Sequence, residues 1–298
     1  YINENNLVEL VRDIRSSVGY INGDFRTFVI DCGSSLFKTF FKNEGPYDYV
    51  LNLSALKHVR SERDIYSLIR MISTNVLNTE KIIDLSINSK VKNFFSVSTD
   101  KASPPIKNIY GLSKSCMERL FCSSQPYGKT KFVCVRYGNV TWSTGSVLPI
   151  WKRMFNKDKI ILTTGPNMRR FFFSVDEAVS LVDQALKLKD KLNGKILSAE
   201  MRSAKMIEIL KVWIKMLGGK YKTIETRKGD RLDEYLIGED ELKHTEELKI
   251  KNKKYFVIDF NKLAKKPLKK IVSSQNAKRL SRSDIEKIIR FGQNNNDL

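Results

Sequence analysis

Ser98-Thr99-Asp100-Lys101 and Tyr110-Gly111-Leu112-Ser113-Lys114 carry most of the information about this chain's fold. The first segment closes an apolar run that begins at Asn93, and the second lies in a helix expected over residues 107–122. Side chains four residues apart share one helix face, so Tyr110 and Lys114 are expected side by side. A lysine cation near a phenol lowers the pKa of the phenol. The pair therefore predicts a tyrosine that accepts a proton from a substrate hydroxyl.

Apolar strands alternate with helices around this segment. The predicted strands are Thr27–Ile30, Tyr49–Leu53, Asn93–Ser98 and Lys131–Tyr137. The predicted helices are Asn6–Val18, Ser34–Phe41, Ile65–Asn88 and 107–122. Continuous apolar strands separated by helices are typical of a parallel sheet covered on both faces. We therefore expect an α/β fold, a Rossmann-like doubly wound parallel sheet, in residues 1–140.

The regular alternation of strands and helices ends near residue 140. In residues 141–298 we expect a smaller α+β substrate lobe with a basic C-terminal extension. Its predicted helices are 146–156, Val175–Leu186, Ala204–Leu217 and Ser283–Phe291, with a strand at Phe171–Phe173. The lysine-rich stretches Lys249–Lys254 and Lys262–Lys270 are interpreted as surface or loop segments. The second lobe would complete a cleft against the sheet.

Composition and cysteine spacing narrow the class of protein. The 298 residues are 41% hydrophobic and 29% charged, as in globular proteins. We find no apolar run near the roughly 20 residues that span a bilayer, and no signal peptide at Tyr1, so we expect no membrane span and a cytoplasmic location. The four cysteines (Cys32, Cys116, Cys122 and Cys134) lack metal-ligand spacing and are expected to be free thiols, with no metal bound.

The net charge of +20 raises the possibility of a nucleic-acid partner. The lysines are scattered over predicted solvent faces, and the sequence contains no RNP motif, zinc finger or helix-turn-helix spacing. We therefore expect no nucleic-acid partner, and a solvated basic surface instead.

A dinucleotide-binding domain should open with a strand, a Gly-rich turn and a helix that receives the pyrophosphate. Gly19, Gly23 and Gly33 do not form such a turn. Either this fold binds no dinucleotide, or the first strand-turn-helix-strand precedes Tyr1. The motifs below favour the second interpretation.

Several motifs in order resemble the extended short-chain dehydrogenase/reductases. They are Leu53–Val59, Thr74–Leu77, Ser98–Ala102, Tyr110–Lys114, Val135–Val140, Gly145–Pro149, Met168–Phe172 and Arg227–Glu234. Over roughly residues 5–240, the chain is most similar to the UDP-N-acetylglucosamine 4,6-dehydratase group of bacterial polysaccharide and nonulosonic-acid synthesis. One departure is Lys228, which stands where the family usually has proline.

The resemblance implies an internal redox cycle on a sugar. Tyr110 would take the proton of the C4 hydroxyl, with Thr99 hydrogen-bonded to the C4 oxygen. Lys101 would remove the C5 proton, and Asp100 would protonate the departing C6 hydroxyl. The lysine can act as a base only if its surroundings lower its pKa. The remaining implied catalytic roles belong to Lys114, which would bind the nicotinamide ribose and tune Tyr110, and to Asn75, which would hold that lysine through water.

The resemblance also implies an NAD or NADP cofactor and a UDP-sugar or GDP-sugar substrate, in a protein that forms a homo-oligomer. The cofactor side would comprise Asp31, Cys32, Asn52, Ser54, Ala55, Lys57, Tyr110, Lys114 and Tyr137. The substrate side would comprise Lys57, His58, Asn139, Ser146, Val147, Arg170, Arg227 and Glu234. Of these, Arg170 and Arg227 would meet phosphates, and Glu234 the uridine ribose.

Two further functions stay open. A nucleotide-sugar 4-epimerase would share Tyr110 and Lys114, but would need neither a base at C5 nor an acid at C6. An inactive remnant would keep the sugar-nucleotide lobe and bind UDP without binding a dinucleotide.

Overall fold

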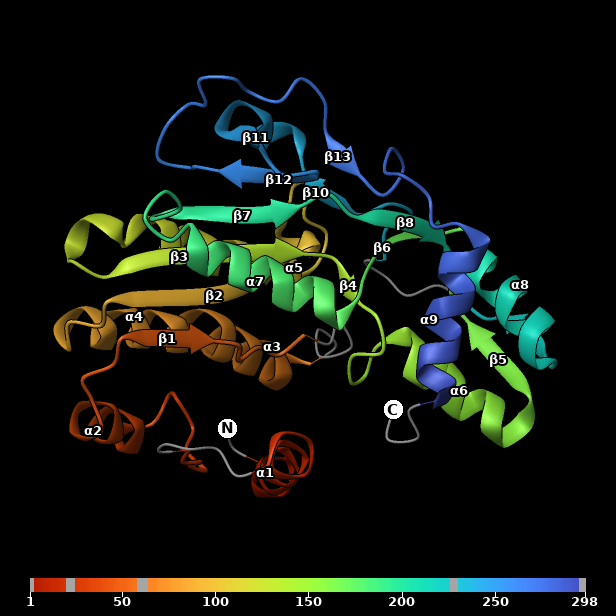
Figure 1. Ribbon diagram of the computed structural model, residues 1–298, viewed down its shortest axis with the longest axis horizontal. Coiled ribbons are helices and arrows are strands. Elements are labelled where there is room, and N and C mark those ends of the chain that lie inside the picture. Colours follow the sequence, from red (N-terminus) through yellow and green to blue (C-terminus); the bar gives the residue numbers. More distant parts are fainter. Residues whose placement is uncertain (1–2, 20–24, 58–63, 226–229, 295–298) are drawn as a thin grey trace.

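A central sheet of six strands organises the molecule, in the order β1-β2-β3-β7-β12-β11 (Figure 1). The computed structural model describes residues 3–19, 25–57, 64–225 and 230–294. Parallel pairing joins β1 (Tyr49–Asn52), β2 (Asn93–Thr99), β3 (Lys131–Tyr137) and β7 (Lys195–Ala199). The antiparallel pair β11 (Thr245–Ile250) and β12 (Lys253–Ile258) extends the sheet beyond β7.

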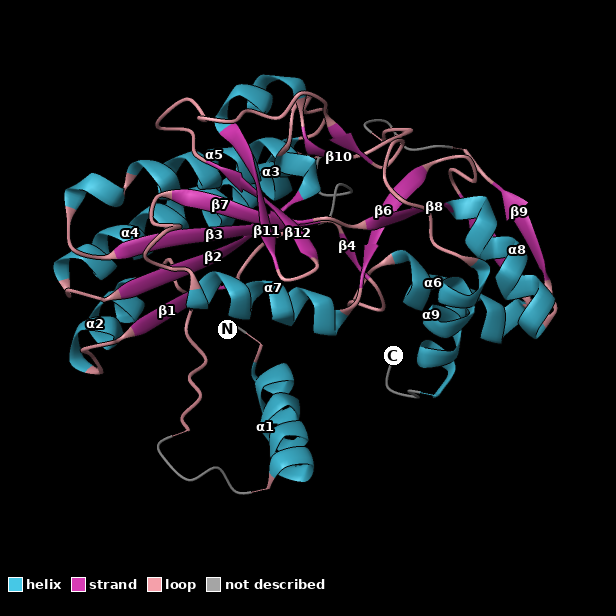
Figure 2. Cartoon of the chain, turned by 45° about the horizontal axis from the view of Figure 1, so that its top comes forward, coloured by secondary structure: helices cyan, strands magenta, loops and turns pink. Residues whose placement is uncertain are grey.

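Helices cover both faces of this sheet. Figure 2 shows α3 (Ile65–Ile72), α4 (Asn78–Asn88) and α5 (Ile109–Ser123) on one face and α7 (Val175–Lys187) on the other. The predicted α/β class and Rossmann-like parallel sheet are confirmed.

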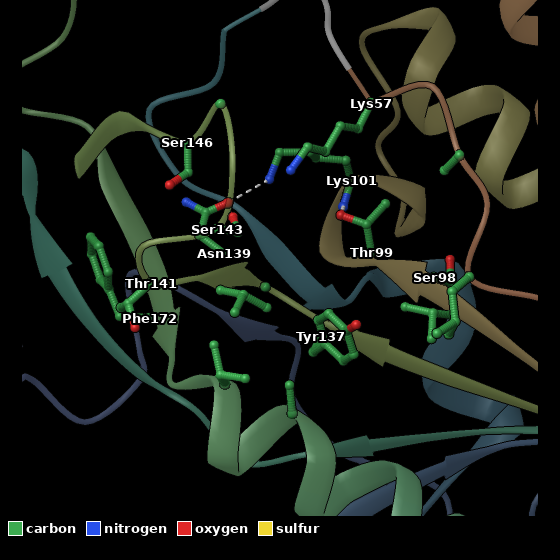
Figure 3. A pocket seen from close by; sticks show the side chains of 18 of the residues that line it. Lys57, Ser98, Thr99, Lys101, Tyr137, Asn139, Thr141, Ser143, Ser146 and Phe172 are labelled. Atoms are coloured by element: carbon green, nitrogen blue, oxygen red, sulfur yellow. Dashed lines mark hydrogen bonds between the residues drawn. The ribbon is translucent and has the colours of Figure 1, made fainter. Parts of the chain in front are cut away.

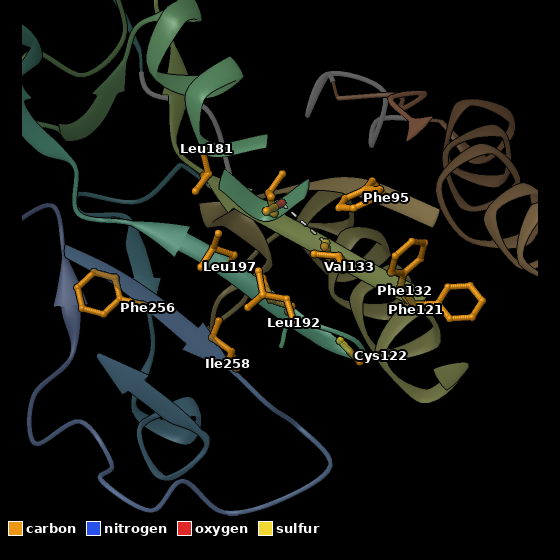
Figure 4. Packing of buried hydrophobic residues seen from close by; sticks show 14 of the residues in the cluster. Phe95, Phe121, Cys122, Phe132, Val133, Leu181, Leu192, Leu197, Phe256 and Ile258 are labelled. Atoms are coloured by element: carbon orange, nitrogen blue, oxygen red, sulfur yellow. Dashed lines mark hydrogen bonds between the residues drawn. The ribbon is translucent and has the colours of Figure 1, made fainter. Parts of the chain in front are cut away.

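The core forms where apolar strands meet these helices (Figure 4). The ring of Phe121 on α5 packs edge-on against Phe94 of β2 and Phe132 of β3, with centroids 4.8 and 5.3 Å apart. Such edge-to-face pairs add to the stabilisation from burial alone. They hold the helix that carries Tyr110 against the two strands that precede the site.

The second lobe is built around a tryptophan cluster. Trp142 is buried there together with Trp151 of α6 (Val147–Asp158) and Trp213 of α8 (Met206–Leu217), and its indole N–H donates to the Ile288 carbonyl of α9 (Arg282–Asn294). Its small sheets are β4-β6-β8 (Asn139–Val140, Arg169–Phe173 and Arg202–Lys205), β5-β9 (Ile160–Thr163 and Lys220–Thr223) and β10-β13 (Tyr235–Ile237 and Val272–Ser273). The helices and the strand predicted for this lobe are present.

Two segments differ from the sequence-based expectation. Thr27–Ile30 forms no strand, because no ladder pairs it with another strand and a lone short strand is unstable. Lys249–Lys254, expected as a surface or loop stretch, belongs instead to the β11-β12 hairpin. Because β7, β11 and β12 join the central sheet, that sheet is not confined to residues 1–140.

A π-helical turn interrupts one predicted helix, and the two N-terminal helices differ in how they pack. The helix expected over Ile65–Asn88 is present, but η2 (Ser73–Leu77), a π-helical turn, separates α3 from α4. Near the start, α1 (Glu4–Val18) buries no residue and stands apart from the sheet in Figure 2, whereas α2 (Ser35–Asn43) packs through Phe41. Within the described ranges, every helix is too short or too polar to cross a lipid bilayer.

Candidate active site

A cavity of about 770 Å³ lies where the carboxyl ends of β1, β2 and β3 meet the second lobe. Ligands of doubly wound sheets bind at this edge. Figure 3 shows Lys57, Thr99 and Lys101 on one side of the cavity, facing Asn139, Ser146 and Phe172 on the other. The cavity therefore brings residues of both lobes together.

The Thr99–Lys101 turn is placed by strand β2 and helix α5. Thr99 ends β2 and caps the short helix η3 (Asp100–Ala102). Asn108 caps α5 by accepting a hydrogen bond from the Gly111 amide at 2.7 Å. A Cβ at Gly111 would collide with the carbonyl oxygen of Lys101. The glycine thus lets the tyrosine helix lie directly against the Asp100–Lys101 turn.

Asp100 is the centre of a hydrogen-bonded chain. Its side chain is fully buried, and its Oδ1 accepts from the Thr99 hydroxyl at 2.9 Å and from the Lys101 Nζ at 2.9 Å. The Thr99 side chain is also hydrogen-bonded to Tyr110. This hydrogen bond lowers the pKa of Tyr110. Lys101, Asp100, Thr99 and Tyr110 are therefore linked in one continuous chain.

The surroundings of Lys101 do not meet the condition for a lysine base, which is a lowered net pKa. Burial lowers the pKa of Lys101, but the carboxylates of Asp100 and Glu234 outweigh it, and the net pKa is raised. The ammonium also donates to the Asn139 Oδ1 at 3.1 Å. Lys101 is consequently an ammonium ion in the resting protein.

Tyr110 and Lys114 also differ from expectation. Burial raises the pKa of Tyr110, whereas the nearby charge that lowers it is that of Lys101. Burial lowers the pKa of Lys114 to about 8, and its Nζ donates to the Met117 sulfur at 3.0 Å. The helical spacing of the pair is as predicted, but the lowered tyrosine pKa is not found.

Asn75 lies in the π-helical turn η2 and is buried. Its carboxamide accepts from the Leu56 amide at 2.9 Å and donates to the Leu56 carbonyl at 2.9 Å and the Ser113 hydroxyl at 3.0 Å. Both of its N–H groups are thus used. Asn75 therefore braces the loop after β1 against α5, and its water-mediated support of Lys114 stays a prediction.

The cofactor-side residues divide into two groups. Ala55, Lys57, Tyr110, Lys114 and Tyr137 line the cavity. Asp31, Cys32, Asn52 and Ser54 do not. Asp31 accepts from the Gly33 amide at 2.9 Å, Cys32 contacts Asn78, and Asn52 accepts from the Ser54 hydroxyl at 2.6 Å.

The substrate-side residues divide in the same way. Asn139, Ser146 and Val147 line the cavity, and Lys57 spans it by donating to the Thr144 carbonyl at 2.8 Å. Arg170 and Glu234 lie outside the lining, 3.7 Å from one another. The expected residues His58 and Arg227 lie outside the described residues.

Sequence reasoning missed the apolar wall of the cavity. Val175, Ala178, Val179 and Val182 on α7 line it, together with Phe172. Val179 is 62% exposed although the opposite side of α7 is buried in the core. The sequence did carry a signal for this wall, because apolar residues occur on two sides of the helix that forms α7. In the described part of the chain, no group of three or more His, Cys, Asp or Glu residues is arranged to hold a metal ion.

The cavity and its acid–lysine–tyrosine chain on a doubly wound sheet define a short-chain dehydrogenase/reductase. The sequence of residues 3–258 matches the family described as "Polysaccharide biosynthesis protein", and the chain belongs to that family.

Curated relatives match over most of the chain. An uncharacterized membrane protein of Methanocaldococcus jannaschii is 35% identical over 255 residues, covering 82% of this chain and 74% of that protein. A UDP-glucose 4-epimerase of Rickettsia felis is 33% identical over 259 residues, covering 81% and 73%.

Two solved structures share the fold. Pen from Bacillus thuringiensis superposes with a TM-score of 0.85 at 26% identity, covering 98% of this chain and 87% of that one. A dTDP-glucose 4,6-dehydratase from Streptomyces venezuelae, solved with NAD bound, has a TM-score of 0.67 at 16% identity and covers 99% and 85%.

Proposed function

We propose that the chain is a nucleotide-sugar 4,6-dehydratase of the UDP-N-acetylglucosamine type that uses NAD or NADP. The observation that carries the proposal is the chain of contacts from Lys101 through Asp100 and Thr99 to Tyr110 at the cavity wall. An acid, a lysine and a redox tyrosine are the groups that loss of water across C5 and C6 requires.

The chain's own side chains fit the nicotinamide-ribose half of such a cofactor. Lys114 is buried and donates to a thioether, which is a weak acceptor, so a ribose hydroxyl offers it a better one. The Ser98 hydroxyl also borders the cavity and is buried without a hydrogen-bond partner. A nicotinamide bound there supplies the hydride acceptor for C4 and the donor for C6.

Tyr110 accepts the proton of the C4 hydroxyl as a phenolate, the form that the Lys101 charge and the Thr99 hydrogen bond favour, after its own proton has passed to water in the cavity. Thr99 orients the phenolic oxygen. The 4-ketone acidifies the C5 hydrogen. Proton transfer from Lys101 to Asp100 across their 2.9 Å hydrogen bond yields a neutral amine and a carboxylic acid together. The amine then removes the C5 proton, and the acid protonates the departing C6 hydroxyl. This transfer reconciles the raised pKa of Lys101 with its use as a base.

A nucleotide-sugar 4-epimerase is the second candidate. It is favoured by the 33% identity to the Rickettsia felis UDP-glucose 4-epimerase, and Tyr110 and Lys114 would serve both reactions. An epimerase would need no acid or base at the position of the Asp100–Lys101 ion pair, and we therefore rank it second.

Incubation with UDP-N-acetylglucosamine and with UDP-glucose, with NAD or NADP supplied, tests the proposal. A dehydratase gives a product lighter by one water in mass spectrometry, whereas an epimerase gives a product of unchanged mass and altered sugar configuration. Calorimetry with UDP, NAD and NADP separates both from an inactive remnant, which would bind UDP alone. The homo-oligomer stays a prediction, to be checked by light scattering.

A further inference from the structure

Glu234 lies behind the cavity wall, within reach of Lys101. Its Oε1 is 3.8 Å from the Lys101 Nζ and 3.7 Å from the Arg170 Nε, and its Oε2 is 3.8 Å from the Arg231 Nη1. Glu234 is only 4% exposed and does not line the cavity. It faces Lys101 from outside the cavity lining.

The backbone fixes Glu234 in this place. Its amide donates to the Ser274 hydroxyl at 3.0 Å, and its carbonyl accepts from the Ser274 amide at 2.8 Å. Two residues further on, the Leu236 carbonyl accepts from Arg136 at 2.9 Å. Arg136 also binds Glu241, which accepts from the Ser103 hydroxyl at 2.8 Å. The segments that carry Lys101 and Glu234 are therefore clamped to the same buried arginine.

We propose that Glu234 is a positioning residue: its carboxylate is the second counter-ion of Lys101 and holds the ammonium between Asp100 and Asn139. The role in turnover rests on the proposed function, because it acts through Lys101. The charged and titratable groups that face this pair are Asp100 on η3, Tyr110 on α5, Arg170 on β6 and Arg231 on the segment before β10. Burial raises the pKa of Glu234, and the charges of Lys101, Arg170 and Arg231 oppose this shift without cancelling it.

The contacts explain why this carboxylate acts by charge. Its nearest cations all stand beyond hydrogen-bond distance, and Oε2 has no hydrogen-bond partner. Opposite charges at this separation still shift a pKa by about 1–3 units when the site is shielded from water. Glu234 therefore raises the pKa of Lys101 and restrains the proton transfer from Lys101 to Asp100.

Titration of the Lys101 side chain tests the proposal without any turnover. In protein with isotope-labelled lysines, the Lys101 NMR signal is assigned by its loss in Lys101→Met. Glu234→Gln should lower the Lys101 pKa by about one unit or more. The matched control is Asp233→Asn, because Asp233 is the adjacent carboxylate and pairs with Arg169 at 2.5 Å. It should leave the Lys101 pKa unchanged.

A second variant keeps the test decisive if Glu234→Gln does not fold. Arg170→Gln removes a cation that lowers the pKa of Lys101, so the Lys101 pKa should rise. An unchanged Lys101 pKa in these variants would overturn the proposal. So would weaker UDP binding in Glu234→Gln with an unchanged Lys101 pKa, because that pattern belongs to a nucleotide contact.

The pH dependence of turnover provides a separate test of the role of Glu234. If the proposed function holds, the acid limb of the kcat profile should move to lower pH in Glu234→Gln, with an unchanged KM. If the parent protein shows no turnover, the proposed reaction fails, yet the Lys101 titration still decides the role of Glu234.

Discussion

Lys114 and Tyr110 lie one turn apart on α5, but the cation that lowers the pKa of Tyr110 is Lys101, on the neighbouring turn. Lys114 donates instead to the Met117 sulfur. The two lysines thus have separate surroundings: Lys101 is held by carboxylates, whereas Lys114 is buried with a weak acceptor. The two lysines are therefore expected to affect stability and chemistry differently.

Replacing Lys114 with Met should change how stability depends on pH. The Lys114 pKa is about 8 in the folded protein and 10.5 ordinarily, so between these values the unfolded chain binds more protons. The folded state is therefore penalised below pH 8, and the penalty disappears as the pH rises toward 10.5. Lys114→Met should be more stable than the parent at neutral pH by up to about 3 kcal/mol. Urea unfolding at several pH values measures the difference, and a constant difference would contradict the prediction.

Replacing Tyr110 with Phe should abolish the chemistry and spare the fold. The ring is buried, and only the hydroxyl that meets Thr99 is lost. Turnover of the sugar nucleotide should fall by about 10²–10⁴-fold. Mass spectrometry measures turnover and calorimetry checks that UDP still binds. Retained turnover would remove Tyr110 from its proposed role.

Replacing Asp100 with Asn should separate oxidation from dehydration. The amide keeps the shape but cannot protonate the C6 hydroxyl, so water loss should fall by about 10²–10⁴-fold while C4 oxidation continues. Reduced nicotinamide should then accumulate, which absorbance follows directly. Asp183→Asn is the control, because Asp183 pairs with Lys187 at 2.5 Å on the exposed side of α7. Full epimerisation by Asp100→Asn would favour the epimerase.

Replacing Arg136 with Met should destabilise the fold strongly. Arg136 is fully buried, and its Nη2 lies 2.6 Å from the Glu118 Oε2 and 2.8 Å from the Glu241 Oε1. Its loss leaves both carboxylates buried without their cation. Breaking such a pair costs about 3–5 kcal/mol of unfolding free energy. The control is Arg282→Met, because the Arg282–Glu286 pair on α9 is more exposed and should contribute about 0.3–0.5 kcal/mol. Equal denaturation midpoints for the two variants would refute this.

The sequence predicted the elements that local pattern determines. The helix expected over residues 107–122 is present as α5, and the strands β2 and β3 follow from their continuous apolar runs. These features need only the order of residues along the chain. Thr99 and Tyr110 were assigned to the site through the family resemblance, and both line the cavity.

The sequence could not predict features that depend on contacts between distant segments. The β11-β12 hairpin was obscured by its lysines, which are exposed or partly exposed, while Tyr255 and Phe256 beside them are buried. The family resemblance assigned Glu234 to a ribose, and no local pattern reveals that its side chain also lies 3.8 Å from Lys101. The absent pairing of Thr27–Ile30 is likewise a property of the sheet and not of those four residues.

The contact of Gly111 with the Lys101 carbonyl has a consequence for protein engineering. The distance from the Tyr110 phenol to the Asp100 and Lys101 side chains depends on a backbone–backbone contact between α5 and the turn. The choice of side-chain rotamers alone therefore cannot reproduce that distance. A designer who transplants these reactive groups into another scaffold must therefore transfer the whole turn-and-helix unit, with its side-chain-free junction intact.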